Sequence, residues 1–291
     1  MELVSAVIIT HNRKDLVMRA IESVLTQTYT NIECIVVDDA STDGTVELLS
    51  SSEDINYIYI PKSESRGGNH ARNVGIAASH GVYVAFLDDD DYWLPTKIEK
   101  QLALIKEKKC GVVYCGMRPE FISVYGDIRY EDWPPAEGGY GDLSHKILTK
   151  IYTITSGLLV KKSLLLEVGC FDENLKYWQE YELVIRLAQE TSIYAVKECL
   201  FVYRIDEYDG QRLTNKYKSW KASVHYVHKK HKQLYRKLPI ISQIDATRMY
   251  HSEAYHRAKR NSLRIDVFKH KLACALLKRI RYVIILITNL A

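Results

Sequence analysis

The first 115 residues alternate between short apolar runs of strand length and segments with helical periodicity. Apolar runs that are joined by amphipathic helices are typical of a mainly parallel sheet covered by helices on both faces. The pattern therefore predicts an α/β fold for this part of the chain. The predicted strands are residues 4–10, 32–37, 57–60, 82–87 and 112–115. The predicted helices are residues 16–25, 45–49, 69–79 and 95–106.

The pattern changes after this first part of the chain. Residues 118–142 contain several prolines and a Gly138-Gly139 pair, which predicts an irregular insertion that could line a substrate pocket. We expect an α/β domain over residues 1–215 and a basic helical region over residues 216–291. The elements expected between the insertion and the basic region are helices at residues 143–149, 162–168 and 181–189 and strands at residues 155–160 and 193–196.

Composition limits the class of protein. The chain has 291 residues, of which 47% are hydrophobic and 26% charged, so it can bury a core and differs from disordered or collagen-like chains. Its six cysteines form no CxxC pair and have no nearby histidine at metal-ligand spacing. This disfavours a disulfide scaffold and a zinc finger, and it indicates a reducing, cytosolic compartment.

Neither a signal peptide nor a membrane span is predicted. Residues 3–9 are apolar without a preceding basic segment or a small-residue cleavage site, so they are interpreted as a first core strand. The longest apolar run, residues 282–287, is much shorter than the roughly 20 residues that cross a bilayer.

Charge is distributed unevenly along the chain. The net charge is +4, but residues 216–291 hold 18 Lys and Arg against three acids, a net charge of +15. Residues 1–215 hold 22 basic and 33 acidic residues, a net charge of −11. A long basic segment favours phosphate, either on nucleic acid or on lipid headgroups.

Four adjacent carboxylates, Asp88–Asp91, follow the strand predicted at residues 82–87. Charge beside a hydrophobic core is costly unless it is compensated, and a divalent cation would compensate it. Mg²⁺ and Mn²⁺ take one or two carboxylates from a protein and complete their shell with water and phosphate. The alternative is a solvated acidic turn that caps the helix beginning at Pro95. The position at the carboxyl end of a strand favours the metal site.

Two further polar clusters also follow predicted strands. Asp38-Asp39 ends the second strand, and Thr10-His11-Asn12-Arg13 ends the first. A carboxylate at such a strand end can accept a hydrogen bond from a base N–H or a ribose hydroxyl. An Asx-turn with a helix cap is the alternative, and it suits Asp43 better than Asp39. Three polar clusters at successive strand ends indicate a ligand site at that edge of the sheet.

Two other segments carry candidate chemistry. Arg66–Asn73 is a glycine-containing turn that enters a helix with two arginines, and such a turn can contact a diphosphate. It is neither a GxGxxG nor a P-loop motif, which argues against dinucleotide and Walker-type binding. Glu180 and Glu182 lie at the start of a predicted helix, where carboxylates are favoured by the helix dipole. That structural role is the better interpretation for Glu182.

In their order and spacing, these motifs resemble the family 2 inverting glycosyltransferases of bacterial polysaccharide type, which have the GT-A fold. The resemblance covers about residues 4 to 190. The motifs that carry it are VIITHNR (7–13), SVLTQTY (23–29), VDDASTDG (37–44), ARNVG (71–75), FLDDDDYWLP (86–95), GCFDE (169–173) and QEYELVIRL (179–187).

The resemblance implies a UDP-sugar donor and a divalent cation, Mn²⁺ or Mg²⁺. Asp39 would hold the uracil, and Asp88 with Asp90 would form the DxD metal motif, with Asp90 as the direct ligand. The bound metal would neutralise the diphosphate as UDP leaves. The nucleotide-binding positions that the resemblance implies are Thr10, Asn12, Arg13, Asp39, Arg72, Asp88 and Asp89.

The resemblance also assigns Glu180 as the general base, which takes the proton of the acceptor hydroxyl as that oxygen attacks the anomeric carbon from the opposite face. The family usually has a Glu-Asp pair where this chain has Gln179-Glu180, so the base is one methylene longer. Tyr203-Arg204 and Gln211-Arg212 lie where related enzymes have a polar loop that can close over the donor.

The resemblance further implies a lipid-linked glycan as acceptor in surface polysaccharide synthesis. Residues 1–115 would bind the nucleotide and residues 116–215 the acceptor. We expect the basic region to contact anionic lipid on the inner face of the cell membrane, with no nucleic-acid partner. The alternative for this region is a solvated helical subdomain or the contact of a homodimer.

Two other functional classes are weighed against the transferase. A sugar-nucleotide pyrophosphorylase would carry a glycine-rich, basic phosphate loop where this chain has residues 10–13. A non-enzymatic nucleic-acid binder would use the basic region, but the acidic body and the lack of a recognisable binding module disfavour it.

Overall fold

The computed structural model describes residues 1–123, 125–206 and 216–290, which form two compact units. The first unit contains the sheet and consists of Met1–Leu143, Tyr152–Leu175 and the described residues from Gln179 to Asp206. The second unit consists of Ser144–Ile151, Lys176–Trp178 and the described residues from Lys216 onwards.

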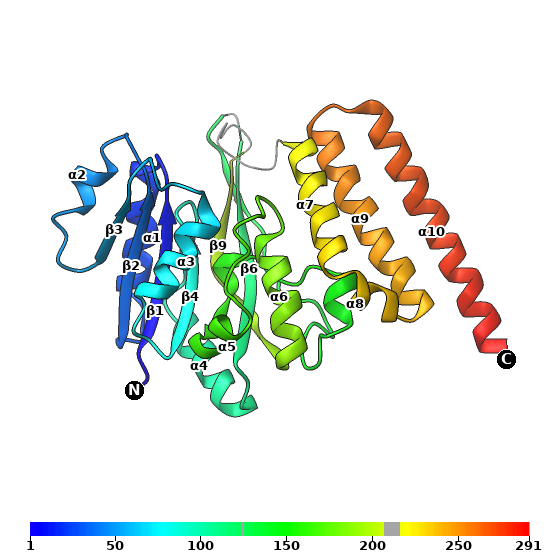
Figure 1. Cartoon of the computed structure of the whole chain (residues 1–291), viewed down its shortest axis with the longest axis horizontal. Coiled ribbons are helices and arrows are strands. Elements are labelled where there is room, and N and C mark those ends of the chain that lie inside the picture. The colour runs from blue at the N-terminus through cyan, green and yellow to red at the C-terminus, as the bar shows by residue number, and fades with distance from the viewer. Residues whose placement is uncertain (124, 207–215, 291) are drawn as a thin grey trace. The chain divides into compact units, whose positions relative to one another are not determined.

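The sheet of the first unit is mixed, with the strand order β3-β2-β1-β4-β8-β6-β9-β5 and with β7 paired to β6 (Figure 1). Its strands are β1 (Val4–Thr10), β2 (Ile32–Asp39), β3 (Asn56–Ile60), β4 (Tyr83–Asp88), β5 (Tyr92–Trp93), β6 (Val112–Ile122), β7 (Ile128–Tyr130), β8 (Leu159–Lys161) and β9 (Ile193–Asp206). The helices of this unit are α1 (Lys14–Leu25), α2 (Thr45–Leu49), α3 (Gly68–Ala78), α4 (Lys97–Lys108), α5 (Lys162–Glu167) and α6 (Gln179–Glu190), with a 3₁₀ turn, η2, at Thr155–Gly157.

The predicted parallel arrangement is found in the run β3-β2-β1-β4, where every pair of neighbouring strands is parallel. Beyond β4 the direction changes, because the short strand β8 pairs antiparallel with both β4 and β6. The strands β6 and β9 are again parallel to each other. The sheet is therefore less uniformly parallel than the sequence pattern predicts. The strand predicted at residues 155–160 is the 3₁₀ turn η2 followed by the short strand β8, and an apolar run does not reveal the direction in which a strand pairs.

The irregular insertion predicted at residues 118–142 is partly wrong. Strand β6 continues to Ile122 and forms a hairpin with β7, and β9 extends to Asp206 instead of ending near residue 196. The register of the β6–β9 pair shifts between Cys115 and Met117 of β6, where β9 carries extra residues. Charged residues and Pro119 conceal the strand in the sequence, and pairing with β9 is what keeps this segment extended.

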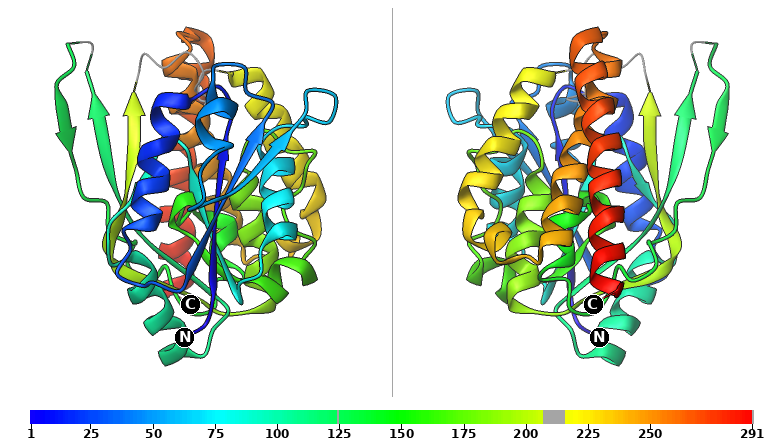
Figure 2. Two further views of the ribbon diagram at one scale, coloured as in Figure 1. Left: turned by 90° about the vertical axis from the view of Figure 1, so that its left-hand side faces the viewer. Right: turned by 90° about the vertical axis from the view of Figure 1, so that its right-hand side faces the viewer.

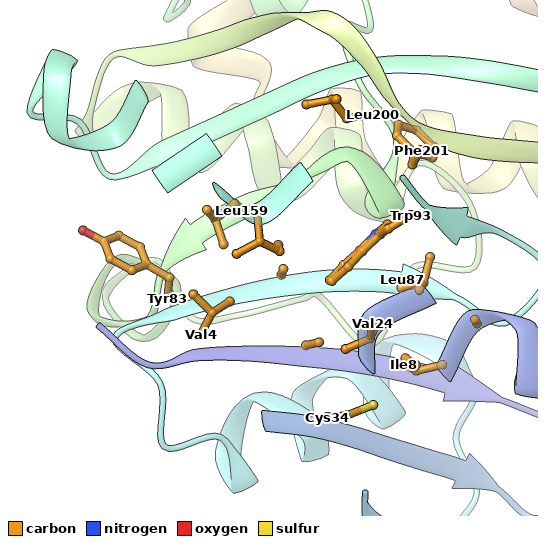
Figure 3. Packing of buried hydrophobic residues seen from close by; sticks show 14 of the residues in the cluster. Val4, Ile8, Val24, Cys34, Tyr83, Leu87, Trp93, Leu159, Leu200 and Phe201 are labelled. Carbon is orange, nitrogen blue, oxygen red and sulfur yellow. The ribbon is translucent and has the colours of Figure 1, made fainter. Parts of the chain in front are cut away.

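Alternate side chains of β1 enter different layers of the core. Val4, Ala6 and Ile8 pack in one cluster with hydrophobic residues of α1 and α4, and Figure 3 shows Val4 near Tyr83 and Ile8 near Leu87, both of β4. On the other face, Val7 lies against Gly75 of α3, and a Cβ atom at Gly75 would overlap the Val7 side chain. Burying an aliphatic side chain of this size stabilises the folded state by about 1.5–3 kcal/mol. The packing of these two layers therefore holds in place the strand ends that carry the polar clusters.

The second unit is helical, as the sequence predicts. It contains α7 (Tyr217–Lys230), α8 (Lys232–Lys237), α9 (Ile240–Arg260), α10 (Arg264–Leu290) and a 3₁₀ turn, η1, at Lys146–Thr149. Figure 2 shows α9 and α10 side by side. Trp220 is fully buried and stacks on Tyr250, with ring centroids 5.9 Å apart. Within the described residues, no helix is both long enough and apolar enough to span a membrane.

Candidate active site

The polar loops that follow β1, β2 and β4 meet at one edge of the sheet, because the three strands are parallel neighbours. Thr10 is in register with Asp38, and Ile9 with Asp88. The loop after β1 is held to the loop after β2 by Asn12. Its backbone N–H donates to Ser41 Oγ over 2.8 Å, and its Oδ1 accepts from the Thr42 N–H over 2.7 Å.

Asp38 and Asp39 have different roles in the structure. Asp38 is completely buried, and its carboxylate accepts hydrogen bonds from the Ser41 N–H at 2.8 Å and the Tyr57 hydroxyl at 2.9 Å. Asp39 accepts one hydrogen bond at Oδ2, from the Gly67 N–H at 2.9 Å. Its Oδ1 is buried and has no hydrogen-bond partner within the described chain. Because an unsatisfied buried acceptor costs about 1–3 kcal/mol, Oδ1 is suited to a donor group on a ligand.

Arg72 of α3 and Asp88 of β4 form a close ion pair. The guanidinium Nη2 lies 2.6 Å from Asp88 Oδ1, and the Arg72 side chain is 6% exposed. The guanidinium also lies over the ring of Phe171, 5.5 Å from its centroid. Two residues that the resemblance assigns to the nucleotide are therefore brought together, with the arginine held in one orientation.

Arg13 compensates the middle of the acidic run. Its Nη1 lies 3.0 Å from Asp89 Oδ1 and 2.8 Å from Asp90 Oδ2. A second arginine, Arg19 of α1, donates to the backbone carbonyl of Asp90 over 3.0 Å and pairs with Glu120 of β6 over 3.2 Å. Arg13 and Arg19 thus supply part of the positive charge that the sequence pattern predicts only from a metal ion.

Asp89 and Asp91 are buried, whereas Asp88 and Asp90 reach the surface. Burial raises the pKa of Asp89 to about 7, with Arg13 opposing the rise and Asp90 adding to it. Burial also raises the pKa of Asp91 well above its usual range, with Asp90 and Asp88 adding to the rise.

The surroundings of Asp91 explain why it is buried. It accepts hydrogen bonds from the Ser156 hydroxyl at 2.6 Å and from the backbone N–H of Arg204 at 3.1 Å. Asp91 therefore fastens the end of β4 to η2 and β9. The sequence motif alone does not separate this structural aspartate from its neighbours.

The remaining pair, Asp88 and Asp90, fits a particular kind of metal site. Their side chains are 32% and 19% exposed. Within the described residues, no group of three or more His, Cys, Asp and Glu side chains is arranged to hold a metal ion. Mg²⁺ and Mn²⁺ are commonly held by one or two carboxylates together with substrate phosphates. The donor set therefore fits a cation whose shell a bound diphosphate completes.

Glu180 and Glu182 both lie in the first turn of α6. Glu182 is completely buried, and its Oε2 lies 2.7 Å from Nη2 of Arg186, one helical turn away. Arg186 also donates to the backbone carbonyls of Val168 and Cys170. Glu182 therefore holds the segment that follows α5, in accordance with the structural role expected for it. Glu180 is half-buried in the same turn.

The motif at residues 169–173 docks onto α3 beside Arg72. Asn69 Nδ2 donates to the carbonyl of Asp172 at 2.7 Å, and Asn73 Nδ2 donates to that of Phe171 at 2.9 Å. Asn73 also donates to the carboxylate of Glu173 at 3.0 Å. These asparagines follow Gly67 and Gly68 in the sequence, but the residues they contact lie about 100 positions away, so the sequence alone does not reveal their role.

The polar loop expected near the donor is described only in part. The backbone of Arg204 holds Asp91, and its guanidinium Nη2 lies 2.8 Å from Asp206 Oδ2. Gln211 and Arg212 lie outside the described residues.

Comparison with known sequences identifies the family. The family model described as Glycosyl transferase family 2 matches residues 5–168. The chain is 35% identical over 208 residues to an uncharacterized glycosyltransferase of Rickettsia prowazekii. This match covers 70% of this chain and 64% of that protein. It is 43% identical over 114 residues to the Escherichia coli UDP-Glc:alpha-D-GlcNAc-diphosphoundecaprenol beta-1,3-glucosyltransferase WfaP. This second match covers 39% of this chain and 45% of that protein. The matched stretches thus span less than two thirds of either relative.

Solved structures share the fold. The structure of Staphylococcus aureus TarS 1-349 in complex with UDP-GlcNAc gives a TM-score of 0.63 at 16% identity, covering 95% of this chain and 92% of that one. The mannosyltransferase PcManGT from Pyrobaculum calidifontis in complex with GDP-Man and Mn²⁺ also gives 0.63, at 18% identity, covering 96% and 79%. These similarities confirm the predicted GT-A fold, and the sequence match shows that the chain belongs to glycosyl transferase family 2.

Proposed function

We propose that the chain is an inverting, metal-dependent glycosyltransferase that moves a sugar from a UDP-sugar to an acceptor hydroxyl. The observation that carries this proposal is the buried Asp39 Oδ1, which has no hydrogen-bond partner within the described chain. It lies at the same edge of the sheet as the Arg72 guanidinium and the acidic run Asp88–Asp91. A uracil N–H would satisfy this oxygen, and the UDP-GlcNAc named with TarS supports a uridine nucleotide as ligand.

In this proposal the nucleotide is held by residues of the three strand-end loops. Arg72 and Arg13 would face the diphosphate, and the loop of Thr10 and Asn12 would contact the nucleoside. Asp89 keeps Arg13 in place through its ion pair. Asp88 and Asp90 would hold Mn²⁺ or Mg²⁺, and such an ion supplies countercharge to the leaving diphosphate when it is bound. The Mn²⁺ named with the mannosyltransferase supports this cofactor class.

Glu180 would act as the general base. Its carboxylate takes the proton of the acceptor hydroxyl, the hydroxyl oxygen forms a bond to the anomeric carbon, and the bond from that carbon to the UDP oxygen breaks. Attack from the face opposite the leaving group inverts the configuration. Positioned base catalysis commonly contributes ~10²–10⁴-fold to the rate. The location of Glu180 in the first turn of α6 supports the assignment, because the buried ion pair of Glu182 with Arg186 fixes that turn.

The acceptor in this proposal is a lipid-linked glycan of bacterial surface polysaccharide synthesis. The name of WfaP, which specifies a sugar diphosphoundecaprenol acceptor, supports this class. Residues 1–115 would bind the nucleotide and residues 116–215 the acceptor.

We also propose that the protein is cytoplasmic and binds peripherally to the inner face of the cell membrane through α10. Five residues with helical spacing support this, because their side chains are 51–86% exposed although they are large and apolar. Lysines lie on the same helix, and the basic region as a whole has a net charge of +15. An apolar face flanked by lysines is typical of a helix lying in an anionic bilayer surface. The five residues are Ile265, Phe268, Leu272, Leu276 and Val283.

Calorimetric titration of the full chain with UDP, CDP and GDP tests the nucleotide site. We expect UDP to bind in the presence of Mn²⁺, and Asp39→Ala to weaken UDP binding by about tenfold or more through the lost hydrogen bond to a charged acceptor. Asp43→Ala is the matched control, because the Asp43 carboxylate caps local backbone and hydroxyl groups. Equal binding of all three nucleotides, unchanged in Asp39→Ala, would contradict the proposal. Release of UDP across a panel of UDP-sugars with a lipid-linked acceptor then tests the transfer itself.

A further inference from the structure

A cavity of about 430 Å³ opens within the helical second unit, between α7, α8 and α9. It shares no residue with the strand-end site. Its size falls within the range of small-molecule pockets in proteins. The residues that define its chemistry are His228, Lys232, Tyr235, Arg236, Tyr250 and His251.

Aromatic rings form the walls of this cavity and are held by one another. The ring centroid of His228 lies 4.7 Å from that of Tyr235 and 6.2 Å from that of Tyr250, in edge-to-face arrangements. Tyr250 stacks on the fully buried Trp220 with an interplanar angle of 4°. The aromatic wall is thus fixed before any ligand binds. Such faces carry negative charge density and attract the C–H groups of a sugar ring.

The polar groups of the cavity favour an anion. Lys232 and Arg236 lie one helical turn apart on α8, and the lining within the described chain contains no acidic side chain. His228 Nε2 is buried and has no hydrogen-bond partner among the described residues. Burial lowers the pKa of His228, which favours the neutral ring, and a hydrogen bond from a ligand would satisfy Nε2.

We propose that this cavity binds a sugar phosphate at a site separate from the nucleotide site. The phosphate pairs with Lys232 and Arg236, the sugar ring packs against Tyr235 and Tyr250, and a sugar hydroxyl meets His228 Nε2. Charge-assisted hydrogen bonds from lysine and arginine are the usual means of holding phosphate. The ligand is either a free sugar phosphate or the glycosyl diphosphate headgroup of a lipid, since both present the same chemistry.

The test measures binding to the full chain with UDP and Mn²⁺ present to occupy the nucleotide site. The probes are N-acetylglucosamine 1-phosphate, N-acetylglucosamine and inorganic phosphate. Their binding is measured by calorimetry and by changes in the NMR signals of the histidine rings. We expect the sugar phosphate to bind about tenfold more tightly than either part alone and to shift the His228 ring signal.

Matched variants assign the binding to the cavity. The double variant Lys232→Gln/Arg236→Gln is expected to weaken sugar phosphate binding by about tenfold or more. The control Lys229→Gln/Lys237→Gln makes the same change in charge at exposed positions of α7 and α8 that do not line the cavity. His228→Phe keeps the ring and removes its nitrogens, so it is expected to reduce binding of the sugar phosphate and leave binding of inorganic phosphate unchanged.

Three results would overturn the proposal: no binding of the sugar phosphate, binding of inorganic phosphate with equal affinity, or equal effects of the two double variants. Retained UDP binding separates such a failure from a failure of the proposed transferase. A short-chain prenyl diphosphate sugar in detergent identifies the source, because tighter binding than the soluble sugar phosphate supports a lipid headgroup and equal binding supports a free sugar phosphate.

Discussion

The guanidinium of Arg13 lies 2.8 Å from the Asp90 carboxylate, the group to which the family resemblance assigns direct metal ligation. Arg72 holds Asp88 in the same way over 2.6 Å. Two arginines therefore compensate the two carboxylates of the acidic run that reach the surface. In the proposed function, a bound diphosphate would attract the two arginines, and a cation would take the carboxylates that the arginines release.

Substitutions within the acidic run should separate catalysis from stability. Asp90→Asn removes the charge of a partly buried carboxylate that reaches the surface, and we expect it to lower metal-dependent UDP release by about a hundredfold or more while the melting temperature stays within a few degrees. A matched change at the exposed Asp54, which precedes β3 at the end of the strand away from the candidate site, should leave activity unchanged. Undiminished turnover of Asp90→Asn in Mn²⁺ would contradict the assignment of Asp90 to the metal.

Asp91→Leu should have the opposite effect. Its carboxylate satisfies the Ser156 hydroxyl and the Arg204 N–H in a fully buried place. Leucine leaves both donors without that acceptor, and each unsatisfied buried group costs about 1–3 kcal/mol. We expect urea denaturation to give a free energy of unfolding lower by about 2–5 kcal/mol. A change below about 1 kcal/mol would show that Asp91 does not fasten β4 to its neighbours.

A second pair of variants tests the start of α6. Glu180→Gln keeps the size of the side chain and removes its basicity, so kcat should fall ~10²–10⁴-fold while UDP affinity is unchanged. Glu182→Gln breaks the buried ion pair with Arg186 and should lower the free energy of unfolding by about 2–3 kcal/mol. If Glu180→Gln turns over like the unchanged enzyme, the base is another residue.

The sequence predicts the location of the candidate site better than its internal pairing. Thr10, Asp39 and Asp88 are expected together because parallel strands bring their carboxyl ends to one edge. The contact of Arg13 with Asp89 joins residues that are 76 positions apart in the sequence, so no local sequence pattern predicts it. The same holds for the cavity of the helical unit, which depends on how α7, α8 and α9 pack. The sequence also does not predict the exposed apolar face of α10, because the packing of the helix in the fold decides which of its apolar side chains are exposed to solvent.

Vesicle binding tests the proposed role of α10. Flotation with anionic vesicles should recover the full chain, and Phe268→Ser/Leu272→Ser should weaken this binding by about tenfold or more through lost apolar burial. Lys271→Gln/Lys278→Gln should weaken binding to anionic vesicles only, since each basic residue near the surface contributes about 1 kcal/mol.

The control for vesicle binding is Leu166→Ser, which removes a 57% exposed leucine from the sheet unit. Equal recovery with neutral and anionic vesicles would reject the electrostatic part of the proposal. A dimer in sedimentation that Phe268→Ser/Leu272→Ser dissociates, without any vesicle binding, would favour the homodimer instead.

The helical unit should lose stability in mild acid because of His270. Its side chain is buried, and its Nε2 lies 2.9 Å from the Tyr217 hydroxyl. Burial lowers the pKa of His270, and His251, Lys269 and Lys221 add to the effect while Asp266 opposes it. The folded state therefore binds fewer protons than the unfolded state, so stability is full above the unfolded pKa of about 6.5 and falls as the pH drops below it.

Thermal unfolding between pH 7.5 and 5.5 should show this decline, and His270→Gln should flatten it. A decline of the same slope in the variant would assign the acid sensitivity to other groups, such as His251 and His228, whose pKa values are also lowered by burial.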